Sequence, residues 1–271
     1  MKSFRLLVIL LTSIAALVVA AFAWTLTRAD DTAHTPADPV ITTMPTSRTF
    51  PDPPQSPPVT RPPTTDLFGT RLEVPAEESG VALKQEPGTR PDPARPDYLS
   101  AAPARMQWQR GWGGAALPVS SSDGPARIVH GVAQDFAHTP QGAALAALDA
   151  LGRALAAPEG IWQQVVAQRY YGGGSALVNR FARSRENTPA AARYVVVPDG
   201  VRVRPGYRDD LAVVELANRT TGGGYRITTW PMAWIDGDWR VRVPEDIETL
   251  WGPGTPTPTL DEGFGPWQGQ P

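Results

Sequence analysis

The spacing of apolar residues changes once along the second half of the chain. Over residues 139–181, leucine, valine and aromatic residues recur three and four positions apart, which is typical of amphipathic helices. From about residue 191 onward, apolar and polar residues alternate, which is typical of strands with one buried face. The pattern therefore predicts a group of helices followed by an antiparallel sheet.

Three helices are predicted from their starting residues and their apolar faces. The first begins at Thr139, a preferred N-cap residue, and has Pro140 at its first position. Pro158 and Glu159 open the second helix, and Ser175 caps the third after a run of glycines. The apolar faces comprise Leu145, Leu148, Leu151 and Leu155 in the first helix, Ile161, Trp162, Val165, Val166 and Tyr170 in the second, and Leu177, Val178 and Phe181 in the third.

The alternating segments predict five strands, at residues 194–198, 201–207, 211–218, 225–235 and 238–244. Asp236 and Gly237 between the last two suit a tight primed hairpin turn, which needs positive backbone angles. Pro231 has no N–H to give to a ladder, so it marks an edge or a bulge in its strand. We expect an α+β domain in which three helices pack on a curved, cone-like antiparallel sheet.

Composition divides the chain into four regions. Residues 1–29 contain the cytoplasmic start and a transmembrane anchor, and residues 30–97 form a disordered stalk rich in proline. The α+β domain occupies residues 98–252, with its core at about 127–250, and residues 253–271 form a disordered tail.

Two islands of apolar residues interrupt the predicted stalk, at residues 67–75 and 80–85. They are either part of a flexible linker or a segment that docks, by strand addition, on its own domain or on a partner.

The amino end carries an uncharged apolar run at residues 6–26. A helix rises about 1.5 Å per residue, so this run matches a hydrocarbon core of roughly 30 Å. Lys2 and Arg5 precede the run, which favours a single-pass protein of the cell membrane with a cytoplasmic amino end and an external carboxyl-terminal domain. The alternative is a signal peptide cleaved after Ala21-Phe22-Ala23, and both interpretations export the remainder.

Charge and cysteine content exclude several classes of site. The net charge of −2 lacks the basic excess that nucleic-acid binding requires, so no nucleic acid is expected. The chain has no cysteine and only three histidines, which argues against disulfides, thiolate chemistry and a structural zinc site. We expect neither a metal nor a cofactor.

Four residues are candidates for acid–base chemistry: Asp135, His138, Glu215 and Tyr225. His138 directly precedes the predicted N-cap at Thr139, and Asp135 lies at the end of the extended segment before it, where an acid favours a helix amino end. A structural role therefore explains both residues. Glu215 lies on the strand face opposite its apolar neighbours and is expected to be solvated or salt-bridged. We expect no enzyme and no catalytic residue.

Tryptophans cluster near the end of the predicted sheet. Trp230 and Trp234 share one face of their strand, and Trp239 follows in the next strand. Core packing is the ordinary role of such residues, and a surface for a partner or a cell-wall ligand is the alternative. These three are the candidate binding residues.

The order of elements and the closing hairpin at residues 235–241, Ile-Asp-Gly-Asp-Trp-Arg-Val, resemble the nuclear-transport-factor-2-like cone fold over about residues 127–250. With an amino-terminal anchor, this layout is similar to the inner-membrane assembly subunits of type IV secretion and conjugation machines. Residues 111–125 and 136–148 also resemble an uncharacterised actinobacterial family of membrane-anchored proteins from integrative conjugative elements.

The resemblance implies a non-enzymatic, exported and membrane-anchored scaffold or assembly subunit of a conjugation or secretion apparatus. Its expected partners are the membrane and other subunits of the transfer machine, with a homo-oligomer as a further alternative. Two other functions stay open: a cell-envelope module that binds peptidoglycan or another glycan, and a cone-fold acid–base enzyme.

Overall fold

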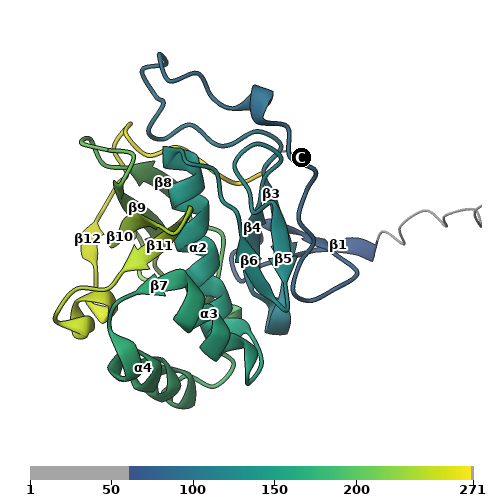
Figure 1. The fold of residues 1–271 in the computed structure, drawn as a ribbon, viewed down its shortest axis with the longest axis vertical. Coiled ribbons are helices and arrows are strands. Elements are labelled where there is room, and N and C mark those ends of the chain that lie inside the picture. The colour runs from purple at the N-terminus through teal and green to yellow at the C-terminus, as the bar shows by residue number, and fades with distance from the viewer. Residues whose placement is uncertain (1–60, 270–271) are drawn as a thin grey trace, which may run out of the picture. The chain divides into compact units, whose positions relative to one another are not determined.

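The computed structural model describes residues 61–269 (Figure 1). The predicted anchor, the alternative cleavage site and the first part of the predicted stalk lie outside these residues. No helix in the range 61–269 is both long enough and apolar enough to cross a membrane.

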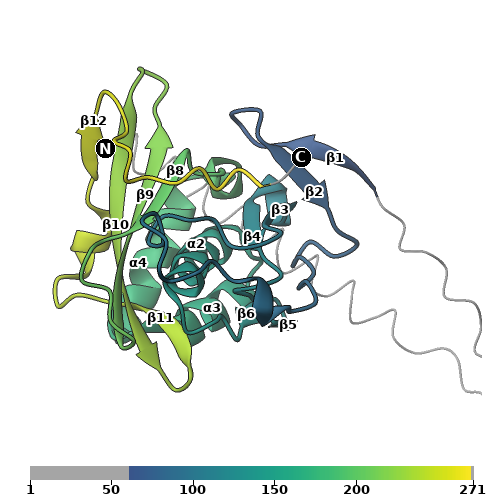
Figure 2. The same ribbon diagram turned by 90° about the horizontal axis from the view of Figure 1, so that it is seen from above.

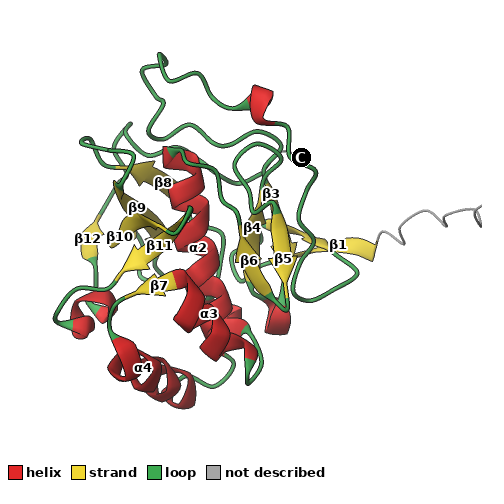
Figure 3. Cartoon of the chain, in the orientation of Figure 1, coloured by secondary structure: helices red, strands yellow, loops and turns green. Residues whose placement is uncertain are grey.

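The described residues form an α+β domain, which confirms the predicted class (Figure 3). Its α-helices are α2 (Pro140–Ala156), α3 (Ile161–Arg169) and α4 (Gly174–Asn187). Single 3-10 turns occupy Pro87–Thr89, Trp112–Gly114, Ala191–Tyr194 and Ile247–Trp251. The start of α2 at Pro140 is as predicted, whereas α3 and α4 begin after Gly160 and Gly173 rather than at the predicted residues.

The larger sheet has six strands and is antiparallel except where β7 joins β11. Its strands run in the order β7-β11-β10-β9-β8, and β12 also pairs with β10. The bounds are β7 (Tyr170–Tyr171), β8 (Gly200–Val203), β9 (Leu211–Arg219), β10 (Tyr225–Ile235), β11 (Asp238–Arg242) and β12 (Thr255–Thr257).

The strand predictions are confirmed for β9, β10 and β11. The strand predicted at residues 194–198 is wrong, because Tyr194 ends a 3-10 turn and residues 195–198 belong to no strand. Asp236 and Gly237 have φ of 53° and 80°, as a primed turn requires. Pro231 lies where β10 is paired on one side only, between its contacts with β12 and β11. The missing N–H of proline therefore leaves no gap in a ladder.

A second, four-stranded sheet lies on the other side of α2 (Figure 2). It is built from β1 (Arg61–Thr65), β2 (Arg71–Val74), β3 (Gln107–Arg110) and β4 (Ala116–Val119), and a separate hairpin pairs β5 (Arg127–Val129) with β6 (Val132–Gln134). The sequence pattern does not predict this sheet, because two of its strands come from the predicted stalk.

α2 is the central helix of the domain. It contacts β4 on one side and β8, β9 and β11 on the other (Figure 2). Every residue of this helix is buried except Leu151, Leu155 and Ala156, which are partly buried. A helix buried on all sides needs small residues as well as large ones, which explains its many alanines.

The structure corrects the predicted boundary at residue 98. Residues 61–97 contain β1 and β2, and the Leu72 side chain is fully buried. β2 adds in parallel to β3, with Glu73 opposite Gln109. The apolar island at residues 67–75 thus docks on its own domain, because burying Leu72 in the core beside β3 offsets the entropy of ordering the segment.

The structure also corrects the predicted disorder of the tail up to residue 269. β12 pairs with β10, and the Trp267 side chain is only 1% exposed. The indole N–H of Trp267 donates to the Ser100 carbonyl oxygen at 2.9 Å, and the indole N–H of Trp108 donates to the Trp267 carbonyl oxygen. The tail is therefore part of the core.

We expect Thr139→Ala to lower the free energy of unfolding by about 1–2 kcal/mol. The Thr139 hydroxyl accepts a hydrogen bond from the Gly142 N–H at 3.0 Å and donates one to the buried Asp123 carboxylate at 2.6 Å. Urea denaturation of the full-length chain in detergent, followed by circular dichroism, measures the loss. Thr139→Ser keeps both bonds and should stay close to the parent protein, and an equal loss in both variants would contradict the capping role.

Candidate functional site

An apolar cleft of about 490 Å³ opens beside the second half of α2. The helix lines it with Leu148, Leu151 and Leu155, and β9 lines it with the buried Leu216. The remaining lining comes from the smaller sheet, the β1–β2 turn, the segment after Ala191–Tyr194 and the β9–β10 hairpin. A concave apolar site with a few polar groups is the usual form of a binding site.

The β1–β2 turn presents Leu67 and Phe68 to the cleft in a fixed conformation. The Asp66 carboxylate accepts hydrogen bonds from the backbone N–H groups of Phe68 and Thr70, each at 2.9 Å, which closes the turn. Its second oxygen accepts from the Val197 N–H at 2.9 Å and ties the turn to the segment that follows Tyr194. Both rims are therefore held in place before any ligand binds.

Two of the large apolar side chains exposed in the described part of the chain lie at this cleft. Leu67 is 52% exposed and Tyr194 is 66% exposed. The backbone beside Tyr194 is anchored, because the Val195 carbonyl oxygen accepts a hydrogen bond from the Ala116 N–H at 2.9 Å. Exposed apolar side chains on an ordered backbone are typical of surfaces that contact another molecule.

The charges at the cleft are all positive. Arg219 and Arg226 line it, and no carboxylate does so among residues 61–269. Arg219 is neutralised by Asp199, and its guanidinium lies 5.5 Å from the centre of the Phe68 ring. Arg226 is exposed and donates to the Pro253 carbonyl oxygen, and no carboxylate of the described chain lies within ion-pair distance of it.

Asp135 and His138 do not form a catalytic pair in the structure. The Asp135 carboxylate binds Arg127, and its backbone N–H donates to Asp238 at 2.9 Å. The His138 ring stacks on Trp234 with 3.9 Å between centroids, and its Nε2 contacts the backbone carbonyl oxygen of Asp209. Both side chains have structural partners, in agreement with the structural role predicted from the sequence.

Glu215 is salt-bridged, which confirms the preferred interpretation. Its carboxylate lies 2.6 Å from Arg202 and 3.8 Å from Arg204. Because Val214 and Leu216 pack in the core with α2, strand alternation places Glu215 on the face of the sheet away from that helix.

Tyr225 lies far from the other acid–base candidates. It begins β10, opposite Arg219 and Thr257, whereas His138 packs near the far end of the same strand. A strand rises about 3.3 Å per residue, so roughly 30 Å separates the two positions. The structure therefore brings only Asp135 and His138 near each other.

The three candidate binding tryptophans lie in or against the core. Trp230 is 6% exposed and Trp239 is fully buried, with its indole N–H donating to the Ala137 carbonyl oxygen at 3.0 Å. Trp234 is partly buried beneath His138. Their large apolar area stabilises the domain, and they do not form the exposed surface that the binding prediction needs.

The carboxyl group with the clearest burial effect is Asp149, in the middle of α2. Burial raises its pKa, against the opposing effect of the Arg153 guanidinium. Asp149 Oδ1 lies 2.6 Å from Arg153 Nε, and both side chains are fully buried. A perturbed pKa is typical of catalytic groups, but no substrate can reach this carboxylate.

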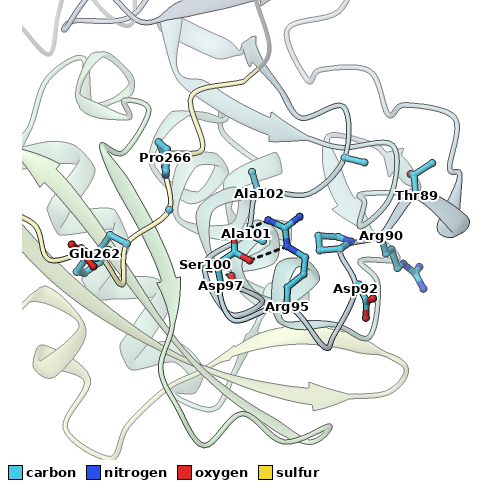
Figure 4. A pocket seen from close by; sticks show the side chains of 14 residues that line it. Thr89, Arg90, Asp92, Arg95, Asp97, Ser100, Ala101, Ala102, Glu262 and Pro266 are labelled. Carbon is cyan, nitrogen blue, oxygen red and sulfur yellow. Dashed lines mark hydrogen bonds and ion pairs between the residues drawn. The ribbon is translucent and has the colours of Figure 1, made fainter.

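A second hollow, of about 670 Å³, lies between the loop at residues 89–104 and the tail (Figure 4). Arg95 and Asp97 at its centre bind each other through two hydrogen bonds of 2.8 and 2.7 Å (Figure 4). Arg90 donates to the Ser122 carbonyl oxygen at 3.0 Å. These charges are already paired within the protein, so the hollow is a weaker candidate than the apolar cleft.

The cleft was not predicted from the sequence. Leu67 lies in the segment predicted to be a disordered stalk, and Tyr194 lies in a segment predicted to be a strand. The only signal was the apolar island at residues 67–75, which contains Leu67 and Phe68. Within residues 61–269, no cluster of three or more histidine, aspartate or glutamate side chains could hold a metal ion.

Residues 73–266 match the family model of a domain of unknown function, DUF8175. The match begins within β2 and ends next to Trp267, so it includes part of the predicted stalk and most of the ordered tail. No curated protein and no solved structure matches the chain significantly.

Proposed function

The chain belongs to the DUF8175 family, and on that premise we propose that this domain is a non-catalytic protein-binding module whose apolar cleft receives part of a partner protein. The observation that carries the proposal is the cleft itself, with exposed Leu67 and Tyr194 on rims fixed by hydrogen bonds. The partner contributes apolar side chains that fill it.

In the cell, we propose that the module serves an exported, membrane-anchored assembly subunit of a conjugation or secretion apparatus. The apolar run at residues 6–26 and the layout of the chain support this setting. The three helices and the six-stranded sheet are compatible with the cone-like arrangement that we infer, and the smaller sheet is an addition to it.

An acid–base enzyme is a weaker alternative. The candidate residues Asp135, His138 and Glu215 each bind another group of the protein, and Tyr225 lies at a distance from the first two. A glycan-binding module is also weaker, because such sites stack sugars on exposed aromatic faces. Trp230 and Trp239 are buried, and the ring of the partly buried Trp234 is stacked on His138.

The proposal is tested by a photo-crosslinking amino acid placed at Leu67 of the full-length protein in its membrane. We expect a discrete adduct with another protein, and Tyr194→Asp should reduce its yield by at least roughly tenfold because a charge replaces an apolar contact. Tyr171→Asp is the matched control, since Tyr171 is 51% exposed and lies outside the cleft.

Mass spectrometry then identifies the adduct. Recovery of membrane channel subunits supports the proposed setting. An adduct that Tyr171→Asp and Tyr194→Asp reduce equally, or none at all, would rule out the cleft as a protein-binding site.

A further inference from the structure

We propose, given that the cleft binds protein as above, that its occupant is a short extended segment with apolar side chains followed by an aspartate or glutamate. The apolar residues sit between α2 and the rims, and the carboxylate pairs with Arg226. The proposed function alone does not specify this chemistry of the partner.

The polarity of the cleft is asymmetric. Apart from the aromatic rings, its polar lining side chains all come from the β9–β10 hairpin: Asn218, Arg219, Thr220, Thr221 and Arg226. The rest of the lining is apolar, including Leu151 and Leu155 on the helix and Leu67 on the turn. A ligand that fills this site therefore has an apolar part toward α2 and a polar part toward the hairpin.

The sign of the charge at the polar end is set by Arg226. Asp199 binds Arg219 through Nε at 2.8 Å and through a second guanidinium nitrogen. The charge of Arg219 is therefore largely neutralised within the protein. Arg226 stands opposite Asn218 in the ladder, and within residues 61–269 it has a carbonyl oxygen as its hydrogen-bond acceptor. A guanidinium without a carboxylate partner is suited to bind one from a ligand.

The walls at this end are also ordered before binding. The hairpin loop is closed by the Thr220 N–H, which donates to the Gly224 carbonyl oxygen at 3.0 Å, and by the Thr220 hydroxyl, which donates to the Gly223 carbonyl oxygen at 2.7 Å. Arg219 holds Phe68 from one side. A rigid site loses little entropy when it orders an extended peptide.

The test uses the full-length protein in lipid nanodiscs and a phage library of random nine-residue peptides. Selection should enrich peptides with two apolar positions followed by aspartate or glutamate. Arg226→Glu should weaken the best peptide by roughly tenfold and, in a new selection, favour lysine or arginine at the acidic position. A selection on the Arg226→Gln variant should no longer favour aspartate or glutamate in the peptide, and it should not favour lysine or arginine instead.

Arg183→Glu is the matched control, because Arg183 is an exposed arginine on α4 outside the cleft and should leave the selection unchanged. The selected peptides could bind the Tyr194→Asp variant more weakly and yet show no enrichment of aspartate or glutamate. That result would overturn this inference and leave the proposed function unchanged. If no selected peptide depends on Tyr194, both fail. Arg226-dependent binding of oleate in place of any peptide would also overturn the inference, since the occupant would then be an acyl chain.

Discussion

Replacing Trp267 with alanine lowers the free energy of unfolding of the domain by about 3–5 kcal/mol. The side chain is 1% exposed, and its removal leaves a cavity against the segment at Ser100 and the neighbouring Trp108. It also leaves the Ser100 carbonyl oxygen without its indole donor. Urea denaturation of the full-length protein in detergent, followed by far-ultraviolet circular dichroism, measures the change.

Gln268→Ala is the control for this prediction, because Gln268 is the exposed neighbour of Trp267. It should change the free energy of unfolding by less than about 0.5 kcal/mol. If the two variants are equally stable, the tail does not belong to the core, and the boundary predicted from composition would be restored.

Arg153→Met lowers the free energy of unfolding by about 3–5 kcal/mol at neutral pH. The guanidinium pairs with Asp149 and also donates to the carbonyl oxygens of Ser79 at 2.7 Å and Gly131 at 3.0 Å. Methionine fills much of the volume but leaves a buried carboxylate and two carbonyl groups without a donor. Breaking one half of a buried pair costs more than the pair contributes, since the remaining charge has no water around it.

The loss in Arg153→Met should depend on pH. Burial raises the pKa of Asp149 in the folded protein, and removing Arg153 takes away the opposing effect. A raised folded-state pKa favours the protonated carboxyl, so the variant keeps most of its stability below the pKa of an unfolded aspartate. It loses that stability as the pH rises through the raised folded-state value.

The double variant Asp149→Leu with Arg153→Met is the control. It removes both charges, so it should recover part of the loss at neutral pH and lose the additional pH dependence. Thermal unfolding at several pH values checks both results. A single variant whose loss is the same at acidic and neutral pH would contradict the role of the buried carboxylate.

Local patterns in the sequence predicted the parts of the fold that depend on local physics. The N-cap at Thr139, the primed turn at Asp236 and Gly237 and the long strands β9 and β10 follow from propensities within a few residues. These elements are also those in which spacing and turn chemistry indicate the same structure.

The candidate site was not predictable in the same way. Leu67 and Tyr194 are separated by most of the domain in sequence, and the cleft needs both in its lining. A proline-rich composition indicated disorder for the segment with Leu67, but that estimate considers only what the segment can bury by itself. The buried Leu72 shows that β3 and the core of the domain supply the missing apolar surface.

By itself, the sequence determined the α+β class, the beginning of the central helix and the main hairpin, because each depends on the period of apolar residues and on the residues at turns. The tertiary structure alone decided where the domain ends and where its cleft lies. Burial of Leu72 and Trp267 depends on surfaces contributed by distant parts of the chain. Such contacts offset the entropy of ordering a polar, proline-rich segment, and no local pattern reports them.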